Sequence, residues 1–153
     1  MIYNNPNQVN QVSPKGRILA LDLGTKRIGI AISDASRFIA TPKLVLNRQS
    51  NQKDFLKIWQ LFQEYEAVTI VIGMPLNMNG MRNEMSEFVD KFTKNFDEFL
   101  EGKISIFLFD ERLSSFEAKE IAASELSRKN NEFIDDIAAS VILQHFLDEI
   151  KSE

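Results

Sequence analysis

The sequence predicts an α/β fold with a mixed five-stranded sheet and helices on both of its faces. Two observations lead to this prediction. Three apolar runs of strand length follow one another from residue 17 and are joined by short connections, which is typical of a meander. Amphipathic stretches then alternate with short β-branched runs, as in β-α-β units.

The three strands of the meander are expected at residues 18–23, 28–33 and 38–46. Residues 24–27, with the sequence Gly-Thr-Lys-Arg, join the first two strands as a β-hairpin. Pro42 lies inside the third run. Because proline cannot donate a hydrogen bond to a sheet ladder, we expect this strand at an edge or a bulge.

The rest of the chain alternates between amphipathic helices and two short, buried strands, at residues 68–72 and 104–109. Helices are expected where apolar residues recur at helical spacing or where Ser114 or Ser115 caps a first turn. These helices cover residues 53–65, 84–100, 114–128 and 134–150.

Composition narrows the functional classes. The 153 residues include no cysteine, which excludes disulfides, thiolate metal sites and cysteine nucleophiles. The net charge of −4 is unevenly distributed: residues 1–60 hold nine Lys/Arg against three Asp/Glu, and residues 61–153 hold nine against nineteen. A polyanion such as nucleic acid can therefore approach the N-terminal part despite the acidic total.

The N-terminal segment and the length of the apolar runs indicate the cellular location of the protein. The longest apolar runs are of strand length, so we expect no membrane span and no membrane partner. Residues 1–14 are rich in Asn and Gln and lack the basic and apolar regions of a signal peptide. We expect a disordered tail over 1–14, a single domain over 15–153, and a cytoplasmic protein.

Acidic residues at the ends of core elements are the most informative feature. Asp22 lies within the apolar strand, Asp110-Glu111 ends the last strand, and Asp135-Asp136 opens the final helix. A carboxylate in a buried strand is costly unless a cation or hydrogen bonds compensate it. Oxygen ligands of this kind suit Mg²⁺, and several of them can hold the two ions of a phosphodiester-cleaving site.

The pattern leaves two choices open. Strand alternation puts Asp110 and Glu111 on opposite faces of the sheet, so one of them is expected to be a ligand. Helical geometry favours Asp135 over Asp136, since Asp135 shares the apolar stripe that should meet the sheet. The alternative interpretations are a first-turn acid favoured by the helix dipole and a salt-bridged strand end at Asp110-Glu111-Arg112.

Four segments resemble the motifs of the YqgF family, bacterial pre-16S rRNA nucleases that are also described as Holliday-junction-resolvase-like proteins. They occur in the family's order and cover the chain from residue 17. They are Leu21-Asp22-Leu23-Gly24-Thr25-Lys26-Arg27 with its continuation to Asp34, Val71-Ile72-Gly73-Met74-Pro75-Leu76-Asn77 to Gly80, Asp110-Glu111-Arg112-Leu113-Ser114-Ser115, and Ile134-Asp135-Asp136-Ile137-Ala138-Ala139.

The resemblance implies a ribonuclease H-like fold and nuclease chemistry that depends on Mg²⁺ or Mn²⁺. It implies Asp22, Asp135 and the Asp110-Glu111 pair as the acidic set, with Glu111 favoured within the pair. It also implies a role in maturing the 5′ end of 16S rRNA in the cytoplasm. One departure is Asn130–Phe133, where we expect lysine-rich sequence, so substrate grip there is weaker or comes from neighbouring basic residues.

Several residues are candidates for binding the substrate. Lys26 and Arg27 in the hairpin suit phosphate contacts, and Arg112 follows the acidic pair. Asn77 and Asn79 lie in a turn-forming loop whose amide groups can reach a nucleic-acid backbone. The alternatives are ordinary hairpin charges and a loop that only connects a strand to a helix.

Three alternatives to an RNA-processing nuclease are considered: a nuclease with a DNA substrate, a non-catalytic module, and a kinase or ATPase. A four-way DNA junction is the alternative substrate. A non-catalytic nucleic-acid-binding or ribosome-assembly module would tolerate loss of the acids, whereas this sequence retains all of them. A sugar kinase or actin-like ATPase also begins with Asp-x-Gly-Thr, but it needs about twice this length and a second such motif.

Overall fold

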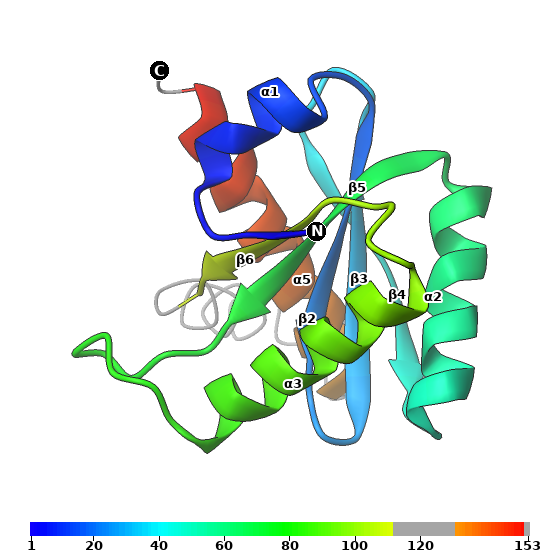
Figure 1. The fold of residues 1–153 in the computed structure, drawn as a ribbon, viewed down its shortest axis with the longest axis vertical. Helices are drawn as coiled ribbons and strands as arrows, with labels where there is room; N and C mark the ends of the chain where they lie inside the picture. Colours follow the sequence, from blue (N-terminus) through cyan, green and yellow to red (C-terminus); the bar gives the residue numbers. More distant parts are fainter. Residues whose placement is uncertain (112–130, 152–153) are drawn as a thin grey trace.

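The computed structural model describes residues 1–111 and 131–151, and the side chains from residue 135 onward in the second range. Its centre is one six-stranded sheet with the order β1-β6-β5-β2-β3-β4 (Figure 1). Strands β1, β6, β5 and β2 run parallel, and β3 is antiparallel to both of its neighbours. The strands are β1 (Ile2–Tyr3), β2 (Arg17–Leu23), β3 (Arg27–Ser33), β4 (Ala40–Asn47), β5 (Ala67–Met74) and β6 (Ile106–Asp110).

Helices cover both faces of the sheet, as expected (Figure 1). Helices α2 (Asn51–Glu64) and α3 (Glu84–Phe99) pack on one face, while α5 (Asn131–Lys151) and the short α1 (Val9–Val12), which follows the 3₁₀ turn η1 (Pro6–Gln8), pack on the other. The alternation of strand side chains produces the two cores, since Leu19 and Leu21 face α2 and α3 whereas Ile18 and Ala20 face α5.

The prediction of a disordered tail at residues 1–14 is wrong, and so is the count of five strands. Residues Ile2 and Tyr3 pair in parallel with β6 and form a sixth strand. The Tyr3 ring stacks on Phe107 with ring centroids 5.0 Å apart, and Val9 is fully buried in the core beneath α5. The segment is ordered because it satisfies the otherwise open backbone groups of β6 and buries these few side chains.

The prediction for Pro42 is confirmed. Strand β4 is an edge strand, and its pairing with β3 shifts register between Ile30 and Ala31. Those two residues pair with Leu44 and Pro42, which leaves Lys43 as the extra residue of a bulge.

The other expected elements agree with the structure to within about three residues at each end, as is usual for boundaries. The expected helix at 114–128, with Ser114 or Ser115 as its cap, lies outside the described residues. Within residues 1–111 and 131–151, the structure contains no helix both long and apolar enough to cross a membrane.

Arg48, between β4 and α2, fixes the hairpin against two helices. Its backbone N–H donates to the carbonyl oxygen of Lys26 at 2.8 Å, and its Nε donates to the buried carboxylate of Asp54 at 3.1 Å. The guanidinium also lies 5.2 Å from the ring centroids of Phe88 and Phe92 on α3. The β2–β3 hairpin is thereby attached to the start of α2.

Candidate active site

The candidate acids gather where three parallel strands end. The carboxyl ends of β2, β5 and β6 lie at the same edge of the sheet, with β5 in the middle. Asp22 is the penultimate residue of β2, and Glu111 directly follows β6. The Glu111 N–H donates to the carbonyl oxygen of Met74 at 3.2 Å, so the chain remains against β5 as it leaves the sheet.

Strand alternation decides which acids share a face. Asp22 lies two residues after Ala20, which belongs to the core beneath α5, and Glu111 lies two residues after Phe109, which packs against the same core. Asp110 alternates to the opposite face and is exposed. Of the Asp110-Glu111 pair, Glu111 is therefore the one beside Asp22, under α5.

Two glycines flank Asp22 on this face and create the space for the site. A Cβ atom at Gly73 of β5 would lie 2.6 Å from Oε2 of Glu111 and 2.7 Å from Cδ1 of Ile142. Gly73 thus leaves room for the Glu111 carboxylate to lie over β5 toward Asp22.

Gly29 of β3 pairs with Asp22 on its other side. A Cβ atom there would overlap the backbone carbonyl oxygen of Asp135, so the first turns of α5 lie directly on the sheet. Both glycines stand in the quoted motifs, but their role was not recognised from the sequence. The available signal was a glycine inside a buried strand, which marks the close approach of another group.

Asp135 reaches the same region from α5, but its carboxylate is paired with the guanidinium of Arg27. Arg27 Nε donates to its Oδ2 at 2.7 Å, and both side chains are about a third exposed or less. The negative charge of Asp135 is nevertheless close enough to raise the pKa of Asp22. Residues that are 108 positions apart in sequence, Arg27 and Asp135, thus meet beside Asp22.

Burial makes the two central carboxyl groups weak acids. Desolvation, followed by the charge of Asp135, raises the pKa of Asp22 from 3.8 to about 7. Desolvation, followed by the charge of Asp22 and a hydrogen bond with it, raises the pKa of Glu111 from 4.5 to about 8. The two groups titrate as a pair that retains a proton near neutral pH when no cation is bound.

The carboxyl pair offers a divalent cation an oxygen atom, but within the described residues it has no third acidic side chain arranged beside it. Oε2 of Glu111 is buried and has no hydrogen-bond partner within the described part of the chain, which is unusual for a carboxylate unless a cation binds there. No group of three His, Asp or Glu side chains within 1–111 and 131–151 is already arranged to hold a metal ion. Asp22 and Glu111 are together, whereas Asp135 is engaged with Arg27.

The candidate substrate-binding residues occupy three places. Lys26 is exposed at the hairpin, and Arg27 holds Asp135. Arg112 lies outside the described residues. Asn77 and Asn79 lie in the loop between β5 and α3, which extends away from the sheet (Figure 1).

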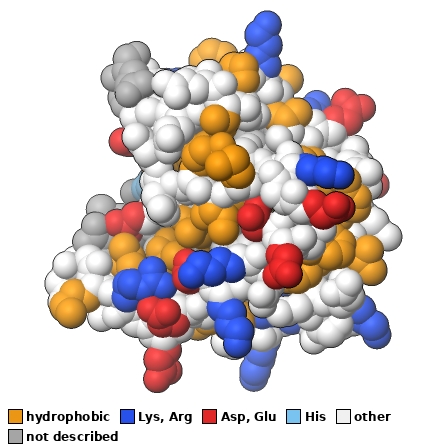
Figure 2. Space-filling view, viewed as in Figure 1, with side chains coloured by type: hydrophobic (Ala, Val, Ile, Leu, Met, Phe, Trp, Pro, Cys, Tyr) orange, Lys and Arg blue, Asp and Glu red, His pale blue; other side chains and the backbone are white. Residues whose placement is uncertain are grey.

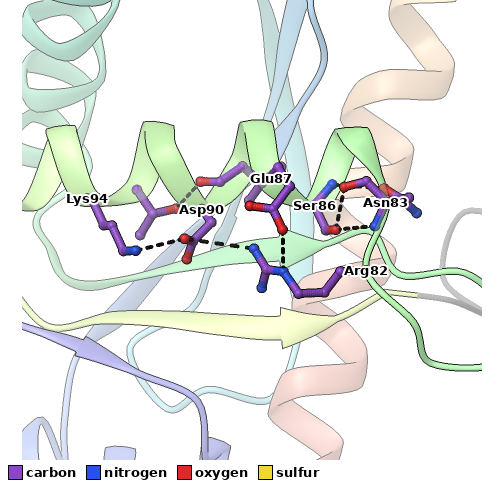
Figure 3. Close-up of polar contacts among 8 residues, drawn as sticks. Arg82, Asn83, Ser86, Glu87, Asp90 and Lys94 are labelled. Atoms are coloured by element: carbon purple, nitrogen blue, oxygen red, sulfur yellow. Dashed lines mark hydrogen bonds and ion pairs between the residues drawn. The ribbon is translucent and has the colours of Figure 1, made fainter.

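Both asparagines use their side-chain oxygens to shape this loop. Oδ1 of Asn77 accepts from the Asn83 amide at 2.9 Å, and Oδ1 of Asn79 accepts from the backbone N–H of Met81 at 3.0 Å. Asn83 and Ser86 cap each other at the start of α3, where Arg82 joins Glu87 and Asp90 (Figure 3). The loop therefore has internal structure, and its contact with nucleic acid stays a prediction.

Comparison with known proteins identifies the family. Residues 16–149 match the family model RuvX, described as Holliday junction resolvase. A relative from Thermoanaerobacter pseudethanolicus, with the name "Putative pre-16S rRNA nuclease", is 43% identical over 140 residues, or 90% of this chain and 99% of the relative. A relative of the same name from Ehrlichia ruminantium is 40% identical over 154 residues, or 99% of this chain and 97% of the relative.

Solved structures agree on the fold at low sequence identity. The Thermus thermophilus RuvC complex with a Holliday junction substrate has a TM-score of 0.55 at 10% identity and covers 86% of this chain and 93% of RuvC. The yeast mitochondrial Holliday junction resolvase Ydc2 has a TM-score of 0.56 at 9% identity and covers 96% of this chain and 86% of Ydc2. The resemblance inferred from the four motifs is confirmed: the chain belongs to the RuvX (YqgF) family of resolvase-like nucleases.

Proposed function

We propose that the chain is a metal-dependent endonuclease that cleaves RNA and matures the 5′ end of 16S rRNA in the cytoplasm. The RNA assignment rests on the pre-16S rRNA nuclease name of relatives that match nearly the whole chain. The chemistry rests on one observation: Asp22, which is half-buried, and Glu111, which is buried, form a carboxyl pair at the carboxyl edge of the sheet. Such a pair is unfavourable in an ordinary core and suits a divalent cation.

Asp22 and Glu111 would hold Mg²⁺ or Mn²⁺, with Asp135 joining them when Arg27 releases it. The bound cation supplies a water molecule of lowered pKa and stabilises charge on the phosphate during hydrolysis. The role of Asp110, on the opposite face, would be limited to its charge near Glu111.

The chain's other residues would orient the substrate. Arg27 balances the charge of Asp135 in the free protein, and on binding its guanidinium can turn to a phosphate instead. Lys26, exposed beside it, would contact the next phosphate. Asn77 and Asn79, in the loop between β5 and α3, are proposed contacts to the nucleic acid. Arg112, which lies outside the described residues, is proposed as a contact from its place in the sequence motif alone.

A four-way DNA junction is the second candidate substrate. The family description and the two resolvase structures favour it, although the structures are similar in fold alone. Cleavage of matched RNA and DNA substrates distinguishes the two. A protein that binds nucleic acid but cleaves neither with any divalent ion would be the non-catalytic module.

The first prediction concerns Asp22→Asn. Because Asn removes a ligand without changing the size of the side chain, cleavage of precursor rRNA in Mg²⁺ or Mn²⁺ should fall by more than the 10- to 100-fold typical of losing an outer-shell partner. Without metal, the variant should melt no lower than the wild type, because a neutral amide removes the repulsion within the pair. Added metal should no longer raise its melting temperature.

Glu98→Gln on the exposed surface of α3 is the matched control and should retain wild-type cleavage and metal response. If Asp22→Asn keeps the metal-dependent rise in melting temperature, Asp22 is not a ligand.

The second prediction concerns pH. The folded protein keeps protons on Asp22 and Glu111 up to pKa values of about 7 and 8, whereas the unfolded chain releases them near 3.8 and 4.5. The free energy of unfolding of the metal-free protein should therefore fall as pH rises from about 4 to 8, by up to about 1.4 kcal/mol per pH unit for each retained proton. Urea denaturation at several pH values measures this slope.

Mg²⁺ should accordingly stabilise the protein more at pH 8 than at pH 5.5, where it must displace protons. Glu111→Gln should flatten the pH dependence, and Glu98→Gln should not. A metal-free protein whose stability is constant or rises over this range would contradict the proposed protonation of the pair.

The third prediction separates the two glycines. In Gly73→Ala the added methyl group meets the far ends of two flexible side chains, Glu111 and Ile142, which can turn away. This variant should lose cleavage and metal response while losing about 1–3 kcal/mol of stability. In Gly29→Ala the methyl group meets the backbone of Asp135, which has less freedom, so the loss of stability should be larger.

Cleavage rates and urea denaturation measured on both variants check this prediction. Full activity in Gly73→Ala would show that Glu111 need not lie over β5.

A further inference from the structure

A groove lies between the edge strand β4 and helix α2, with a volume of about 330 Å³. Its lining includes Lys53 and Lys57 on α2 and three amide side chains, Asn47, Gln49 and Gln60. All five residues are exposed. Lys53, Lys57 and Gln60 follow one another at helical spacing, so they share one face of α2.

The charge of this β4–α2 groove is positive. The acid among its lining residues is Asp54, and the carboxylate of Asp54 is buried and paired with Arg48. No exposed acid among the groove residues therefore balances the positive charges of the two lysine ammonium groups. The three amides add hydrogen-bond donors, which phosphate and sugar oxygens accept.

One end of the groove lies beside the β2–β3 hairpin, whereas the candidate acids lie on the opposite face of the sheet, under α5. Asn47, at the end of β4, pairs with Arg27, and Arg27 holds Asp135. Arg48, the next residue, donates its backbone N–H to the carbonyl oxygen of Lys26. A nucleic-acid strand that leaves the carboxyl edge of the sheet over the β2–β3 hairpin would thus pass Lys26 and enter the groove at Asn47.

The neighbouring helix α3 offers no comparable path. It carries five acids against two lysines, whereas the solvent-facing groove side of α2 is basic. Acidic and basic side chains are interspersed on the molecular face that carries both helices, so that face as a whole is not a basic patch (Figure 2). The groove side of α2 therefore attracts a polyanion more strongly than α3 does.

We propose that the β4–α2 groove binds the sugar–phosphate backbone of the nucleic acid that flanks the cleavage point. Lys53 and Lys57 contact phosphates, and Asn47, Gln49 and Gln60 hydrogen-bond the backbone. This inference rests on the proposed function, which sets the direction in which the nucleic-acid strand leaves the site. Binding of nucleic acid to the groove can nevertheless be measured without cleavage.

The test compares two double variants in their binding to RNA without divalent metal, followed by fluorescence anisotropy at several salt concentrations. Lys53→Gln/Lys57→Gln removes both groove charges and keeps good helix formers. Lys91→Gln/Lys94→Gln makes the same change in net charge on α3. One RNA is a hairpin with a long single-stranded extension, and a second RNA lacks the extension.

The groove variant should bind the extended RNA at least about tenfold more weakly, and its plot of log affinity against log salt should lose about 0.7–0.9 in slope per lysine. The α3 variant should bind as the wild type does, and the RNA without the extension should bind wild type and groove variant alike. Equal losses in both double variants, no loss in the groove variant, or no RNA binding by the wild type would each overturn the proposal. Binding as predicted with no metal-dependent cleavage would overturn the proposed function alone.

Discussion

The structure depends on one constraint: two carboxyl groups, half-buried Asp22 and buried Glu111, lie together at the carboxyl edge of the sheet, and desolvation raises the pKa of both. Neither can ionise freely there, so a proton or a cation must compensate the pair. Gly73 exists as glycine because the Glu111 carboxylate lies above it, and Gly29 because the backbone of α5 does. A core selected for stability alone would fill this space with apolar side chains.

Much of the fold follows from patterns that the sequence displays. The spacing of apolar residues located helices α2, α3 and α5 but not the short α1, and Pro42 indicated both the edge and the bulge. Strand β1 could not be predicted, because two residues carry no periodicity. Its pairing depends on β6, which lies about a hundred residues later in the chain.

The sequence singled out Asp22 and Glu111, which the structure brings together, but it revealed less of their geometry. Alternation showed that Asp110 and Glu111 face opposite ways, but only the register of β2, β5 and β6 decides that Glu111 joins Asp22. The ion pair between Arg27 and Asp135 joins distant segments, so no local pattern reveals it. It also explains why Asp135 is close to Asp22 in the free protein without completing a metal-binding group.

The central claim is that a divalent cation replaces a proton on the Asp22–Glu111 pair. Calorimetric titration with Mn²⁺ at pH 6.5, in buffers of different ionisation enthalpy, counts the protons released on binding. With pKa values of about 7 and 8, the account predicts release of between one and two protons per protein at this pH, and progressively less release toward pH 9, where the pair is already ionised. Binding of Mn²⁺ without proton release at pH 6.5 would contradict it.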